Sequence, residues 1–149
     1  MSKFLLNIFI IIIITFSHSF SQGTTDLVNI CKSENGNAKY LKHFKVRFEK
    51  SKNPKKAPSA DYTILLNKGN HYRFNVHNDS TKTGKAILTL YDDYNVFGSN
   101  FVESTGKEYK YFDFYCKRTN PYYISIKFKD GEEGAAVGML SFVKRFNPN

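Results

Sequence analysis

Seven basic side chains that lie close together in the sequence are the strongest candidates for contacting a ligand. The segment from Lys32 to Lys56 holds nine basic residues against only Glu34 and Glu49, whereas the residues after it are close to neutral overall. Such an excess favours an anionic partner: an anionic polymer, a glycan or an acidic protein. The alternative is a solvated strand edge whose lysines prevent edge-to-edge pairing. The candidate contacts are Lys42, Lys45, Arg47, Lys50, Lys52, Lys55 and Lys56.

Two cysteines, Cys31 and Cys116, could form a covalent bridge. In an oxidising compartment the expected outcome is one disulfide, which would tie the N-terminal segment to a late strand. Two free, buried thiols are the alternative.

Acidic turns are the places where a cation could bind. Asp92, Asp93 and Asn95 form a weak calcium candidate, because calcium prefers several oxygen ligands on one turn. Neither this turn nor the one at residues 130–133 has the alternating acids of a calcium loop, and turns favour aspartate and glycine for conformational reasons. Zinc-type pairs of histidine or cysteine are missing from the sequence. No metal site and no cofactor is therefore predicted.

Catalytic side chains are equally hard to find. Past the first 21 residues the histidines are His43, His71 and His77, and no Gly-x-Ser-x-Gly motif accompanies them. A nucleophile needs a base and an orienting acid beside it. The prediction is no catalytic residue and no enzyme, and a hydrolase ranks third among the functions considered.

The first 21 residues have the pattern of an export signal. Lys3 precedes a nearly unbroken apolar run at residues 4–16, and Ser19 and Ser21 form a small-x-small cleavage site. The run is too short to span a membrane, and no second one follows, so no transmembrane segment is expected after cleavage. We predict a signal peptide at 1–21, an N-terminal segment at 22–37 and one domain at 38–146, exported to the periplasm, the cell surface or the medium. Loss of Lys3 lowers the formal net charge from +9 to +8.

Alternating apolar and polar residues dominate the domain. Phe44 and Val46 alternate with Lys45 and Arg47, and similar two-residue periods recur with turns between them. About eight short strands at this spacing predict an all-β fold, a single antiparallel β-sandwich of the jelly-roll kind. The expected strands centre on residues 44–48, 62–66, 72–76, 86–91, 96–102, 109–116, 122–128 and 135–143.

Within residues 62–126 the strand sequences resemble the bacterial pre-peptidase C-terminal domain, a β-sandwich. The matching stretches are Tyr62–Leu66, Lys68-Gly69 with Tyr72–Val76, Leu88–Asp92, Phe112–Phe114 and Tyr122–Ile126. Thr119-Asn120-Pro121 departs from the family, which usually has a glycine before the tyrosine of the late strand. The resemblance implies a non-catalytic module of an exported protein. Some modules of this family bind calcium or polymeric substrates.

These observations predict an exported binding module that engages an anionic or polymeric surface through the basic residues. No specific recognition of nucleic acid is expected. The alternative is a structural or inhibitory protein that binds a partner protein in an envelope or secretion complex. The two hypotheses differ in what they predict for binding. Binding to an anionic surface should weaken as salt rises and as the lysines are neutralised, whereas binding to a partner protein should be insensitive to those lysines.

Overall fold

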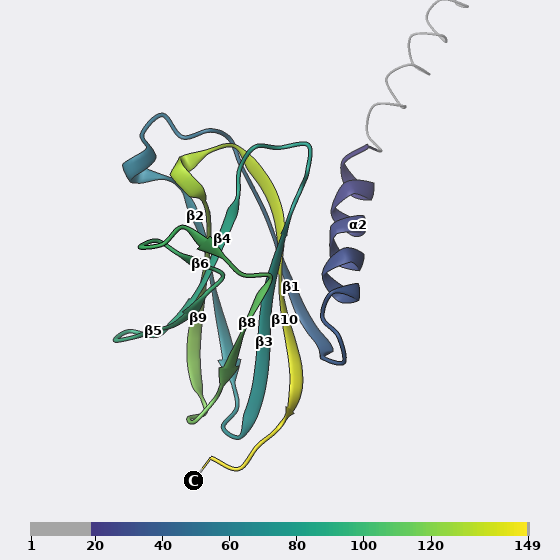
Figure 1. Cartoon of the computed structure of the whole chain (residues 1–149), viewed down its shortest axis with the longest axis vertical. Coiled ribbons are helices and arrows are strands. Elements are labelled where there is room, and N and C mark those ends of the chain that lie inside the picture. Colours follow the sequence, from purple (N-terminus) through teal and green to yellow (C-terminus); the bar gives the residue numbers. More distant parts are fainter. Residues whose placement is uncertain (1–18, 149) are drawn as a thin grey trace, which may run out of the picture.

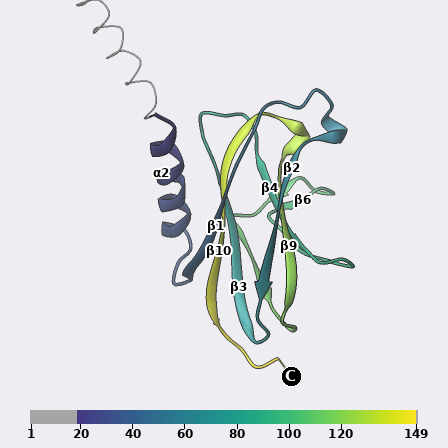
Figure 2. The same ribbon diagram turned by 180° about the vertical axis from the view of Figure 1, so that it is seen from behind.

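The computed structural model describes residues 19–148, so most of the predicted signal peptide lies outside the described residues. Two four-stranded antiparallel sheets pack face to face and form a β-sandwich, with a helix on the outside of one of them (Figures 1 and 2). The elements are α2 (Ser19–Ser33), β1 (Lys39–Phe48), η2 (Pro54–Lys56), β2 (Ser59–Leu66), β3 (Asn70–Asn78), β4 (Ala86–Tyr91), β5 (Val96–Ser99), β6 (Phe101–Val102), β7 (Lys107–Glu108), β8 (Tyr111–Tyr115), β9 (Asn120–Phe128), η3 (Lys129–Gly131) and β10 (Gly134–Arg145).

The strand order is β1-β10-β3-β8 in the first sheet and β2-β9-β4-β5 in the second. The chain crosses between the sheets after β1, β2 and β3, an arrangement typical of a jelly roll. The all-β prediction is therefore confirmed, but the predicted number of strands is too low. Ten strands are present in the described residues, because β6 and β7 form a separate two-stranded hairpin.

The core lies between the two sheets and is built from the apolar residues of each alternating strand. Phe74, Leu88 and Ile124 are completely buried there. Burial of each such side chain contributes roughly 1.5–3 kcal/mol relative to an exposed one. The alternation that predicted the strands thus reflects one face in the core and one face toward solvent.

Helix α2 packs on the outer face of the first sheet. Leu27, Val28 and Cys31 lie on one side of the helix and contact Val137 and Met139 of β10. Between the helix and β1, Gly36 has a positive φ of 59° in a turn that the Ala38 N–H closes by donating to the Asn35 carbonyl at 3.2 Å.

The predicted disulfide is wrong: both cysteines are free and buried. Cys31 belongs to the small cluster beneath α2, where its thiol donates to the carbonyl of Val137 at 3.4 Å. Cys116 belongs to the main core on the opposite face of the same sheet. A disulfide needs its two Cα atoms within about 7 Å, and here a layer of backbone separates the side chains. Burial raises the pKa of Cys31 to about 12 and also raises that of Cys116.

Among residues 19–148, no helix is both long and apolar enough to cross a membrane.

Candidate functional site

The seven predicted basic contacts are all exposed but do not form one surface. Lys45 and Arg47 point outward from edge strand β1, because Val46 between them is buried in the core. Lys42 lies on the other side of the strand, with its amine 5.6 Å from the centroid of the Phe44 ring. The remaining four lie past the end of β1, in and around η2.

The loop lysines form the most coherent part of this set. Lys50 forms an ion pair with Glu132 at 3.0 Å, so part of its charge is neutralised. Lys52, Lys55 and Lys56 make no ion pair within the described part of the chain. Asn53 caps η2 by accepting a hydrogen bond from the Lys55 backbone N–H, which fixes the loop locally.

The weak calcium candidate is a hydrogen-bonded turn. Oδ1 of Asp92 accepts from the backbone N–H groups of Tyr94 at 2.9 Å and Asn95 at 2.7 Å. The N–H of Tyr94 is the main cause of a lowered pKa at Asp92. No group of three potential metal-ligating side chains is found among residues 19–148. The acids of the other turn, Asp130, Glu132 and Glu133, each contact a lysine.

The three histidines lie at separate places, each with its own partner. His43 contacts the Tyr40 hydroxyl at 2.8 Å, and His77 contacts Glu34 at 2.7 Å. His71 is buried beside Asp113 at 3.1 Å. The structure does not bring them together around a nucleophile within the described residues.

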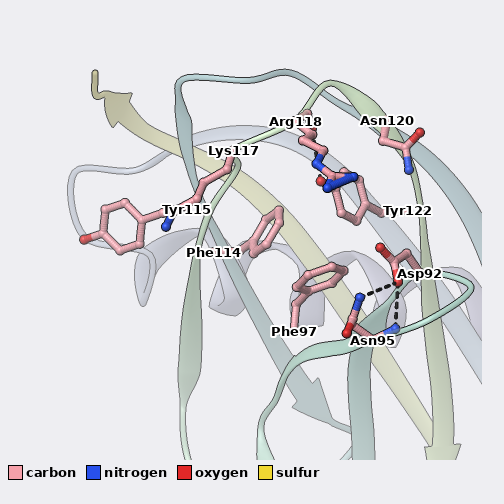
Figure 3. A pocket seen from close by; sticks show the side chains of 9 residues that line it. All are labelled: Asp92, Asn95, Phe97, Phe114, Tyr115, Lys117, Arg118, Asn120 and Tyr122. Carbon is pink, nitrogen blue, oxygen red and sulfur yellow. Dashed lines mark hydrogen bonds between the residues drawn. The ribbon is translucent and has the colours of Figure 1, made fainter. Parts of the chain in front are cut away.

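A cleft of about 320 Å³ lies at the end of the sandwich where the β4–β5 and β8–β9 connections meet (Figure 3). Strands β4 and β9 pair antiparallel with Tyr91 opposite Tyr123, so the end of β4 and the start of β9 are adjacent. This pairing brings Asp92 and Arg118 to one opening although they are far apart in sequence. The lining residues are Asp92, Asn95, Phe97, Phe114, Tyr115, Lys117, Arg118, Asn120 and Tyr122.

Three aromatic rings form the wall of the cleft that adjoins the core. The centroids of Phe97, Phe114 and Tyr122 are 5.2 to 5.4 Å apart and mostly edge to face, a favourable arrangement for aromatic rings. Burial raises the pKa of Tyr122 to about 12, so its hydroxyl stays protonated and donates to the Arg118 carbonyl at 3.0 Å. This bond holds the β8–β9 connection against the wall. The Tyr115 ring, by contrast, points away from the cleft (Figure 3).

Charged and amide side chains form the rim. Arg118, Lys117 and Asn120 are exposed on one side, and Asp92 and Asn95 lie on the other. The Arg118 side chain extends toward the ring of Tyr122 (Figure 3). Neither Arg118 nor Lys117 has a carboxylate within 4.0 Å in the described structure. The rim therefore carries two cations and one carboxylate, and one oxygen of that carboxylate already accepts hydrogen bonds within its own turn.

The tip of the β4–β5 hairpin projects beside the cleft. Tyr94 is 91% exposed and Val96 is 70% exposed, the two highest values among the large apolar and aromatic side chains described. Figure 1 shows this hairpin extending away from the body of the sandwich. Because Asp92 fixes the turn, the two side chains are presented from an ordered backbone.

Comparison with solved structures shows a similar fold in a known protein. The fold is similar to that of PliG from Aeromonas hydrophila, a periplasmic lysozyme inhibitor of g-type lysozyme. The TM-score is 0.51 and the identity 12%, covering 70% of this chain and 88% of that chain. At this identity the likeness shows the fold alone. No protein-family model and no curated protein sequence matches the chain, so the resemblance to the pre-peptidase C-terminal domain stays a prediction.

Sequence reasoning missed most of this site. Of the cleft residues it proposed only Asp92 and Asn95 as ligand contacts, and for a different role. Arg118 is next to Thr119-Asn120-Pro121, which the sequence marks only as a departure from the resembled family. The sequence offered one signal for this site: Tyr94 stands between acidic and amide residues in an expected turn. A large aromatic side chain at such a position is expected to be exposed.

Proposed function

We propose that this protein is an exported, non-catalytic inhibitor that binds a partner protein through the tip of its β4–β5 hairpin. The observation that carries the proposal is the exposure of Tyr94 and Val96 on a turn fixed by Asp92. An ordered convex tip can enter the concave site of an enzyme with little loss of backbone entropy, and tyrosine is enriched among residues that dominate binding energy.

Two further observations support an inhibitory role. The fold neighbour from Aeromonas hydrophila is a lysozyme inhibitor, which favours a binder over an enzyme. The formal charge of +8 after the signal peptide favours a partner with an acidic surface, since opposite charge accelerates encounter. The export signal and the neighbour's periplasmic location both support export.

The test uses residues 22–149 and a g-type lysozyme as the first partner. We expect inhibition of the lysozyme, and we expect Tyr94→Ala to weaken binding by about tenfold or more, the usual effect at a central aromatic contact. Tyr109→Ala is the matched control, because this tyrosine is 43% exposed but belongs to another part of the surface. Absence of both inhibition and binding would reject the lysozyme-inhibitor role. Unchanged binding by the Tyr94 variant would reject the tip as the contact.

A second candidate function is binding to an anionic surface through the η2 loop. It rests on Lys52, Lys55 and Lys56, which are exposed and without ion pairs in the described chain. Replacing all three by glutamine should weaken binding to vesicles containing anionic lipid, and wild-type binding should fall as salt rises. Lys68, Lys107 and Lys110, changed together to glutamine, give a control of equal charge. Equal binding by both triple variants would reject the loop as the contact.

A further inference from the structure

The cleft beside the hairpin has two chemically different sides. Its inner wall is the ring cluster of Phe97, Phe114 and Tyr122, and its rim is made of cations, amides and one carboxylate. A ligand that matches both sides needs one apolar face and a polar, negatively charged edge. We propose that this cleft binds an acidic sugar, a single pyranose ring with a carboxylate, and that Arg118 binds the carboxylate.

The aromatic wall accounts for the apolar face. The C–H groups of a pyranose ring form a flat, weakly apolar surface that packs on aromatic rings. Phe97 is 37% exposed, so part of its ring is accessible, while Phe114 and Tyr122 are buried and hold it in place. The wall is thus an ordered surface before any ligand arrives, which reduces the entropy cost of binding.

The cations account for the carboxylate. Arg118 and Lys117 are adjacent, exposed and without an ion pair in the described structure. The guanidinium of arginine binds a carboxylate through two parallel hydrogen bonds, a stronger and more directional contact than lysine gives. The Arg118 carbonyl is held by the hydroxyl of Tyr122 and the thiol of Cys116, both at 3.0 Å, so its backbone position is fixed.

The amides distinguish a sugar from a simple aromatic acid. Asn95 and Asn120 are exposed on opposite sides of the rim, and each offers a donor and an acceptor. Hydroxyl groups around a pyranose ring can bond to them, whereas an aromatic acid without hydroxyl groups makes no such contacts. Only Oδ1 of Asp92 takes part in the turn, so the other oxygen can accept from a hydroxyl.

The size of the cleft fits one ring. A volume of about 320 Å³ is at the lower end of the range for small-molecule sites, enough for a monosaccharide. The site borders the turn that carries Tyr94, but its aromatic wall and its cations come from Phe97 and from the end of β8 and the β8–β9 connection, and the inference does not depend on the proposed protein partner. It therefore goes beyond the inhibitory function.

The test is a titration of isotopically labelled residues 22–149 with glucuronate, followed by NMR. We expect saturable shifts at the rings of Phe97 and Tyr122 and at Arg118, with a Kd on the order of 1 mM for a ligand of this size. Glucose has the same ring without the carboxylate and should bind at least about tenfold more weakly. Benzoate has the carboxylate without the hydroxyl groups and should also bind more weakly than glucuronate.

Two variants test the assigned roles. Arg118→Gln removes the guanidinium but keeps the backbone carbonyl, and we expect glucuronate affinity to fall about tenfold. Phe97→Ala should weaken glucuronate and glucose alike, because it removes the wall and not the charge. Lys56→Gln is the control: it removes one positive charge from the η2 loop at the other end of the sandwich and should leave affinity unchanged. A thermal unfolding scan confirms that each variant is folded.

Several results would overturn the inference. These are no saturable shifts at the cleft, equal affinity for glucose and glucuronate, tighter binding of benzoate, or equal losses in the Arg118 and Lys56 variants. An arm with oligomers of galacturonate identifies the source of the sugar. Tighter binding per chain than for the monomer indicates a unit of a polysaccharide, and equal binding indicates a free sugar acid; either result supports an acidic-sugar site.

Discussion

Arg73 and Asp113 form a two-point ion pair across β3 and β8, on the outer face of the first sheet. The Arg73 Nε lies 2.8 Å from Oδ1 of Asp113, and Nη2 lies 3.0 Å from Oδ2. The guanidinium also stacks on Tyr111 at 3.8 Å from its ring centroid. Both partners are directly opposite in the strand register, so the pair holds edge strand β8 to the sheet.

Loss of this pair should destabilise the fold in a pH-dependent way. We expect Asp113→Asn to lower the free energy of unfolding at pH 7 by about 1–2 kcal/mol, because a partly buried arginine loses its charged partner. Burial alone would raise the pKa of Asp113, but the hydrogen bonds and charges of Arg73 and, to a lesser extent, His71 together outweigh it and lower the pKa below its ordinary value.

The sign of the pH dependence follows from that lowered pKa. The ionised form stabilises the folded state above about pH 4, and this contribution is lost as the pH falls through the folded-state pKa. Wild type and Asp113→Asn should therefore differ at pH 7 and converge near pH 2 in urea unfolding. An equal difference at both values would contradict the assignment.

The two cysteines should behave as buried thiols. In the native protein, a thiol reagent should label neither Cys31 nor Cys116, because both are buried and burial raises the pKa of each. In denaturant without a reductant it should label both. Adding a reductant should leave the thermal midpoint unchanged. Labelling of no thiol in denaturant would show that a disulfide had formed, as the sequence alone predicts.

The strands were predictable from the sequence wherever one face of a strand is apolar. The candidate site was not predictable in this way. Phe44 and Val46 against Lys45 and Arg47 identify β1, because alternation records burial directly. The cysteine error has a physical cause: sequence shows that both are suited to burial, but not that a sheet lies between them.

The β6–β7 hairpin and the cleft depend on information that local sequence patterns do not contain. Strands β6 and β7 have two residues each, too few for any period to appear. Asp92 and Arg118 meet only through the pairing of β4 with β9. The seven basic residues show the converse: neighbours in sequence are distributed over both sides of β1 and a separate loop.

Gly138 should be intolerant of larger residues. It lies on the inner face of β10, opposite Phe44 and Val76 in the register. A Cβ there would come 2.8 Å from Cδ1 of Ile126 and 2.9 Å from Cδ1 of Leu88, both from the other sheet. We expect Gly138→Val to cost about 1–3 kcal/mol by overpacking the core, measured by denaturant unfolding.

Gly23→Ala is the matched control for that substitution. A Cβ at Gly23 meets no atom within 4 Å, and alanine is favoured over glycine within a helix, so this variant should be at least as stable as wild type. Wild-type stability of Gly138→Val would show that the two sheets can separate locally to admit a side chain, which would contradict the tight packing inferred here.

The Asp92 turn should control the order of the hairpin tip without controlling the fold. Asp92→Ala removes the acceptor for the N–H groups of Tyr94 and Asn95, so their amide hydrogens should exchange roughly five- to tenfold faster. The hydrogen bond from the Tyr94 N–H makes the largest contribution to the lowered pKa of Asp92. In the wild type, the same loosening should appear as the pH falls through that pKa, because the protonated carboxyl is a weaker acceptor.

Asp93→Ala is the control, since this neighbouring acid is exposed and equal in charge. It should leave the two exchange rates unchanged, and both variants should keep a thermal midpoint near that of wild type. If Asp92→Ala leaves exchange at Tyr94 and Asn95 unchanged, the turn does not order the tip. The tip would then lose its backbone entropy on binding, and its advantage as a rigid contact for a partner protein would disappear.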